Sequence, residues 1–98
     1  MNEVLGPSDV DAALARQSLA WRREGDVLVK EVDCVDFAGA LAYVNLVGEL
    51  AERANHHPDV DIRWRTVVLR LTTHSEGGIT ERDLSLAARI DAIGPRRS

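Results

Sequence analysis

The sequence predicts an α+β fold in which helices cover one face of an antiparallel sheet. Three segments show the 3.6-residue spacing of apolar side chains that is typical of amphipathic helices. Segments rich in β-branched residues fall between these helices, and the first of them contains a short turn, as hairpins do. Paired strands between helices favour an antiparallel sheet over the parallel sheet of an alternating βαβ fold.

The N-terminal third is predicted to form a helix followed by a hairpin. Ser8 can cap the helix, and Asp11, three residues later, completes the pattern of a capping box. Residues 21–33 are predicted to form a hairpin because residues 24–26, with the sequence Glu-Gly-Asp, are a turn signal. We expect Trp21 to anchor the first strand in the core.

The longest helix is predicted between an N-cap at Asp36 and a left-handed residue at Asn55, and Pro58 cannot continue it. Its broad apolar stripe consists of Phe37, Ala40, Leu41, Val44, Val47, Gly48, Ala51 and Ala54. A glycine inside a helix costs about 1 kcal/mol relative to alanine. We therefore expect Gly48 to permit close packing against the sheet.

The C-terminal third is predicted to form a strand and a helix. Residues 62–73 have the pattern of one long strand with apolar residues on both faces, so that one face packs on helices and the other meets a second subunit. Thr80 and Asp83 form a second capping box, and Gly94-Pro95 is the expected stop signal of the last helix.

Size and charge restrict the possible functions. The 98 residues predict a single domain spanning 1–98, and so small a core favours self-association. A net charge of −4 argues against a nucleic-acid partner, and we expect Arg96-Arg97 to be a solvated tail. No apolar segment is long enough to cross a membrane. The single Cys34 is expected to be a free thiol in the reducing cytoplasm, because no nucleophile signature surrounds it.

Three histidines lie at the ends of predicted elements. His56 and His57 follow the long helix directly, and His74 ends the predicted long strand. A tight turn after Asn55 could bring the three side chains together at one rim of the sheet. Imidazole exchanges protons near neutral pH, so such a cluster indicates acid–base catalysis.

Zinc binding is the alternative chemistry for three histidines. Because His56 and His57 are adjacent, simultaneous ligation is awkward, and the sequence has neither an HExxH motif nor a cysteine ligand pattern. Asp59 and Asp61 are expected to lie in a solvated turn. We therefore expect no metal.

The histidines belong to a longer pattern that resembles the signature of the pterin-4a-carbinolamine dehydratase family. At the family's spacing, the chain has Glu52, then His56-His57-Pro58, Trp64, His74 and Asp83. The resemblance runs from about residue 21 to residue 93. It implies a four-stranded antiparallel sheet with helices on one face, and self-association as a homodimer or homotetramer. The implied reaction is loss of water from 4a-hydroxytetrahydropterin, giving quinonoid dihydropterin for tetrahydropterin recycling, without metal or cofactor.

The resemblance also implies roles for individual side chains. His56 and His74 are the proton-transfer candidates, and His57 completes the catalytic set by binding or orienting the pterin. Glu52, one helical turn before His56, could orient it or remain a surface carboxylate.

Trp64 and Asp83 are further substrate-binding candidates in the resemblance. Trp64 could cover the pterin ring, although core packing is the better expectation, and capping alone would explain Asp83. Relatives that serve as assembly scaffolds typically have a broken histidine set. The intact set therefore favours an enzyme over a non-enzymatic dimerisation or assembly scaffold.

Overall fold

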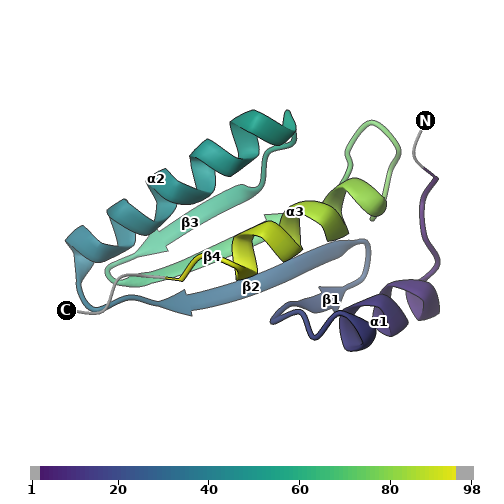
Figure 1. Cartoon of the computed structure of the whole chain (residues 1–98), viewed down its shortest axis with the longest axis horizontal. Coiled ribbons are helices and arrows are strands. Elements are labelled where there is room, and N and C mark those ends of the chain that lie inside the picture. The colour runs from purple at the N-terminus through teal and green to yellow at the C-terminus, as the bar shows by residue number, and fades with distance from the viewer. Residues whose placement is uncertain (1–2, 95–98) are drawn as a thin grey trace.

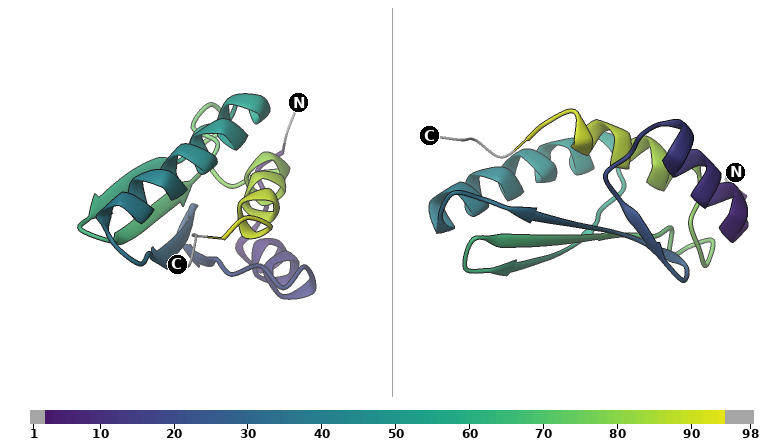
Figure 2. Two further views of the ribbon diagram at one scale, coloured as in Figure 1. Left: turned by 60° about the vertical axis from the view of Figure 1, so that its left-hand side comes forward. Right: turned by 90° about the horizontal axis from the view of Figure 1, so that it is seen from below.

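A computed structural model describes residues 3–94 of the chain. Its four strands form one sheet, with residues 22–24 at one edge, then 27–33, then 66–71, and 59–63 at the other edge, and each neighbouring pair is antiparallel. The helices lie on one face of this sheet (Figure 2), which confirms the predicted α+β class with four strands. In chain order (Figure 1), the elements are α1 (Pro7–Arg16), β1 (Arg22–Glu24), β2 (Val27–Asp33), α2 (Phe37–Ala54), β3 (Asp59–Arg63), β4 (Thr66–Leu71) and α3 (Glu81–Asp91).

The central strands β2 and β4 supply most of the sheet's buried side chains. Leu28 of β2 lies opposite Leu71 of β4, and Val32 lies opposite Val67. These side chains are buried against the helices. Because side chains alternate along a strand, their neighbours in sequence point to the uncovered face. There Val29 lies between Arg22 and Arg70, so this second face is mainly charged with a small apolar centre.

The prediction of one long strand over 62–73 is wrong. β3 and β4 form a hairpin, and Trp64 and Arg65 connect them. Trp64 has a φ of 54°, a left-handed conformation that bulky residues rarely adopt. Without glycine, asparagine or proline, the turn has no sequence signal. The fully buried positions of β4 all point toward the helices, while Val68 lies on the opposite face among charged residues. Contact of that face with a second subunit stays a prediction.

The N-terminal helix α1 begins differently from the prediction. Gly6 occupies the N-cap position, so no side chain caps the helix. Pro7 lies in the first turn, where the backbone N–H that proline lacks would have no partner within the helix. Ser8 and Asp11 therefore form no capping box, and Asp11 instead pairs with Arg23 at 2.9 Å. The hairpin of β1 and β2 matches the prediction, and Trp21 is buried as expected.

Both predicted ends of α2 are confirmed. Asp36 accepts a hydrogen bond from the Gly39 amide at 2.7 Å, and Asn55 ends the helix with a φ of 49°. The expectation for Gly48 is wrong, because it is exposed and a Cβ there would contact nothing. Only the inner half of the predicted stripe is buried, and Phe37 on its outer half is 49% exposed.

The last helix, α3, begins with the predicted capping box of Thr80 and Asp83. It ends at Asp91, before Gly94, while Pro95 and Arg96-Arg97 lie outside the described residues. Asp91 joins this end of α3 to the segment before β1 by accepting hydrogen bonds from the Ala20 amide at 2.7 Å and Trp21 Nε1 at 2.9 Å. Within residues 3–94, no helix is long and apolar enough to span a bilayer.

Candidate active site

A cavity of about 250 Å³ lies among residues at the end of α2, in the loop after β4 and at the start of α3. All three histidines of the sequence contribute to its wall, which is lined by Asn55, His56, His57, Thr72, Thr73, His74, Ser75 and Arg82. The expectation that the histidines meet at one rim of the sheet therefore agrees with the structure. Their chemical roles stay predictions.

The end of α2 determines how the adjacent histidines are directed. Asn55 takes the left-handed conformation, and the His56 amide then donates to the Ala51 carbonyl at 3.1 Å. This reversal turns the imidazole of His56 inward, where it is 8% exposed. The side chain of His57 points outward and is 54% exposed. Neighbours in sequence thus occupy the floor and the mouth of the cavity.

His74 lies in a short loop after β4, not at the end of the strand itself. Thr73 and Gly78 close this loop through a hydrogen bond from the Thr73 amide to the Gly78 carbonyl at 2.9 Å. Gly77 has a φ of 78°, which lets the chain turn this tightly. The loop holds His74 exposed at the cavity wall.

A buried carboxylate fixes the ring of His56. Asp83 has no exposed surface, and its Oδ1 lies 2.5 Å from His56 Nε2. Its Oδ2 accepts hydrogen bonds from Thr73 Oγ1 at 2.8 Å and from the Thr80 amide at 2.9 Å. An ionised carboxylate can only accept hydrogen bonds, so His56 Nε2 carries a proton. In the neutral ring, Nδ1 is then the nitrogen that can accept a proton.

This contact changes the expected roles of the two acidic residues. Asp83 lies behind His56 with no exposed surface, so this geometry favours positioning of His56, and its substrate-binding role stays a prediction. Of the two alternatives for Glu52, the structure does not show contact with His56, because the chain reverses between them at Asn55. Glu52 is a surface carboxylate whose Oε2 contacts His57 Nε2 at 2.5 Å. The Glu52–His57 pair is exposed, so it contributes little to stability.

Trp64 is not brought to the histidines within one chain. It is 70% exposed in the β3–β4 turn, so the expectation that it packs in the core is wrong. β3 separates it from His57 by roughly 20 Å, at about 3.3 Å per residue. Its ring lies 4.9 Å from the guanidinium of Arg65. Trp64 therefore does not cover a pterin bound in the histidine cavity of its own chain.

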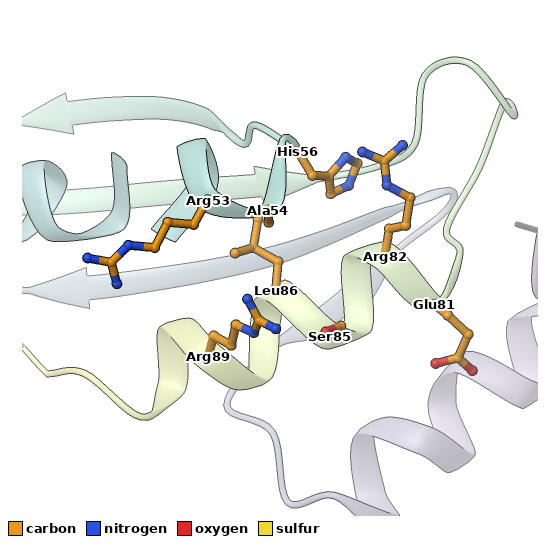
Figure 3. Close-up of a pocket in the computed structure, with 8 residues that line it drawn as sticks. All are labelled: Arg53, Ala54, His56, Glu81, Arg82, Ser85, Leu86 and Arg89. Carbon is orange, nitrogen blue, oxygen red and sulfur yellow. The ribbon is translucent and has the colours of Figure 1, made fainter. Parts of the chain in front are cut away.

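Arg82 is the charged cavity residue that was not predicted from the sequence. Arg82 donates from Nη2 to the Asn55 carbonyl at 2.6 Å, and so bridges the start of α3 and the end of α2. Figure 3 shows its guanidinium beside the imidazole of His56. In the sequence, only its position directly before Asp83, a predicted site residue, indicated that Arg82 could lie near the histidines. Arg82 thus adds a positive charge to a wall otherwise formed by histidines and neutral residues.

Metal ligation was the alternative chemistry for the histidines. Among the described residues, no three histidine, cysteine, aspartate or glutamate side chains are placed to hold a metal ion together. Asp59 and Asp61 lie on β3 and not in a turn, and Asp61 pairs with Arg70 at 3.2 Å. The absence of a metal requirement stays a prediction.

Comparison with known proteins gives the family. The family model described as "Pterin 4 alpha carbinolamine dehydratase" matches residues 3–93. A Nocardia farcinica protein named "Putative pterin-4-alpha-carbinolamine dehydratase" is 52% identical over 87 residues, which are 88% of this chain and 92% of the relative. A Thermomicrobium roseum protein with the same name is 51% identical over 79 residues, 81% of this chain and 85% of the relative.

Two solved structures are similar as well. One is described as a transcriptional coactivator/pterin dehydratase from Brucella melitensis; it has a TM-score of 0.84 and 28% identity, covering 92% of this chain and 97% of that one. The other is a pterin dehydratase-like protein identified as a RuBisCO assembly factor in the alpha-carboxysome, with a TM-score of 0.63, 25% identity and coverage of 78% and 90%. The chain belongs to the pterin 4 alpha carbinolamine dehydratase family.

Proposed function

We propose that the chain removes water from 4a-hydroxytetrahydropterin and forms quinonoid dihydropterin, in the recycling of tetrahydropterins. The observation that carries this proposal is the buried His56–Asp83 contact at the floor of a cavity that His57 and His74 also line. Family membership supports the substrate class. We place the reaction in the cytoplasm, where a single free thiol such as Cys34 stays reduced.

The reaction needs two proton transfers, and the cavity offers a separate imidazole for each. The bond between C4a and the hydroxyl oxygen breaks as that oxygen takes up a proton, and a ring nitrogen loses one. His56 is suited to accept the ring proton, because the carboxylate of Asp83 orients Nδ1 and stabilises the imidazolium that forms. His74, which also lines the cavity, is suited to protonate the departing hydroxyl.

The remaining cavity residues are suited to binding. His57 lies at the mouth, where Glu52 holds its ring, and it can orient the pterin by hydrogen bonding. A cavity of about 250 Å³ is near the lower end of ligand pockets, which suits a compact bicyclic ring. The chemistry proposed here requires no metal or cofactor, since both protons move between imidazoles and substrate.

Self-association as a homodimer or homotetramer is part of this proposal. Phe37 and Leu41 on the outer half of the α2 stripe are 49% and 43% exposed. A chain of this size buries a small core, so covering these side chains with a second copy would add stability. Light scattering at micromolar concentration should give at least twice the 10.8 kDa chain mass, whereas a monomer would contradict it.

A scaffold is the second candidate, because one structural relative is an assembly factor. The two functions differ in a direct assay with synthetic 4a-hydroxytetrahydropterin. As an enzyme, the purified protein should accelerate the loss of water in proportion to its concentration. A scaffold would leave the rate at its uncatalysed value.

A further inference from the structure

A second cavity, of about 340 Å³, adjoins the histidine cavity between the end of α2 and α3. We call it the arginine groove, after Arg53 of α2 and Arg82 and Arg89 of α3, which line it. His56 and Arg82 line both cavities. A ligand with its ring against the histidines could therefore pass a side chain across Arg82 into the groove.

The charge of the groove is opposite to that of the chain. The chain carries a net charge of −4, yet the groove has three arginines against one glutamate, Glu81. Figure 3 shows the Glu81 side chain directed away from His56 and the arginines. Among the described residues, neither Arg53 nor Arg89 takes part in an ion pair. Their charges are thus available to a ligand.

The three guanidinium groups differ in how ready they are to bind. Arg82 is held by its hydrogen bond to the Asn55 carbonyl, which occupies one of its five donors. Arg89 lies along α3 near Ser85, while Arg53 points away along α2 (Figure 3). Arg53 and Arg89 are both exposed, so rotation of their side chains can bring them to a bound anion.

Phosphate is the chemical group that this arrangement favours. Guanidinium groups bind phosphate oxygens through paired, charge-assisted hydrogen bonds, and the exposed hydroxyl of Ser85 adds a further donor. We propose that the arginine groove binds the phosphate of a pterin whose 6-substituent is a phosphate ester, while the ring lies in the histidine cavity. The position of the ring rests on the proposed function, whereas the phosphate site rests on the groove alone.

Calorimetry with stable, oxidised ligands tests this inference without turnover. The ligands are 6-hydroxymethylpterin, its monophosphate ester and inorganic phosphate. The wild type should bind the ester about 10-fold more tightly than the alcohol, because at least one charge-assisted contact is gained. The double variant Arg53→Gln, Arg89→Gln should reduce this preference to about 2-fold or less. The double variant Arg63→Gln, Arg70→Gln, an equal charge change on the uncovered sheet face, should leave it unchanged.

Salt provides a second measure, because raising the ionic strength should weaken binding of the ester and not of the alcohol. Equal wild-type affinities for ester and alcohol would overturn the inference. If inorganic phosphate binds at the arginines and the ester has no advantage, the groove holds a free anion and the link to the pterin is wrong.

A parallel dehydration assay with a neutral pterin separates the two proposals. Turnover of the neutral substrate without tighter binding of the ester would refute only the phosphate site in the groove. Tighter binding of the ester without turnover of the neutral substrate would refute only the dehydratase activity. Both arginines are exposed, so the double variant should keep the wild-type melting temperature.

Discussion

Replacing Asp83 by asparagine tests the contact that orients His56 with almost no change of shape. Oδ1 of Asp83 faces His56 Nε2, while Oδ2 accepts from Thr73 and from the Thr80 amide. In Asp83→Asn, the single amide oxygen can keep the Thr73 and Thr80 contacts, which places the NH₂ group against His56. Since NH₂ only donates, the His56 proton must move from Nε2 to Nδ1.

The expected cost to stability is small and the cost to activity is large. Two of the three hydrogen bonds remain, now to a neutral acceptor, and the third is reversed, so unfolding should become easier by about 1–2 kcal/mol. The proposed base loses its free Nδ1, so kcat should fall by about 10²–10⁴-fold, the range for a lost general base. The contrast between these two effects distinguishes orientation of His56 from a purely structural role.

Two measurements check this prediction. Nitrogen NMR of the imidazole reports which ring nitrogen of His56 carries the proton, and the dehydration assay reports kcat. Asp61→Asn, on β3 away from the cavity, is the matched control and should change neither. If Asp83→Asn keeps the proton on Nε2 and retains wild-type kcat, the reasoning about His56 is refuted.

Three further predictions concern the core and metal dependence. Burial raises the pKa of Tyr43 to about 12, with Asp91 adding to the shift, so the folded state keeps a proton that the unfolded chain loses near pH 10. This stabilisation is present below pH 10, and about 2 kcal/mol should be lost as the pH rises toward 12. Urea titrations at pH 9 and 11.5 should show this loss in the wild type and not in Tyr43→Phe. At pH 7 the substitution should leave the free energy of unfolding unchanged, because the buried hydroxyl has no partner among the described residues. Burial raises the pKa of the Cys34 thiol, and the charges of Asp33 and Asp36 add to the shift. Ellman's reagent at pH 8 should therefore react slowly with the folded protein and quickly with the protein unfolded in guanidinium. Equal rates would contradict the buried position. EDTA should leave dehydration unchanged; about one zinc per chain by elemental analysis, with activity lost to the chelator, would show that the site needs metal.

Local features of the fold were predictable because a few neighbouring residues determine them. Asp36 and the Thr80–Asp83 box cap their helices through side chains three residues from the amides they meet. Asn55 tolerates the left-handed conformation that ends α2. The turn at Trp64 was missed for the opposite reason, since nothing in its composition marks a turn.

Contacts between distant segments could not be read from spacing. Gly48 lies within the apolar stripe of α2, but only the packed structure shows that this part of the stripe is exposed. His56 and Asp83 are 27 residues apart, and the sequence did not show that they touch. The pairing of Glu52 with His57 depends on the reversal at Asn55, which helical spacing alone does not describe.

The most direct test of the histidine mechanism is the dehydration rate of synthetic 4a-hydroxytetrahydropterin with wild type, His56→Ala and His74→Ala. We expect each substitution to lower kcat by about 10²–10⁴-fold. His57→Ala should mainly raise KM, since His57 lies at the mouth of the cavity. A wild-type rate equal to the uncatalysed rate, or wild-type kcat in both the His56 and His74 variants, would contradict catalysis by this cluster.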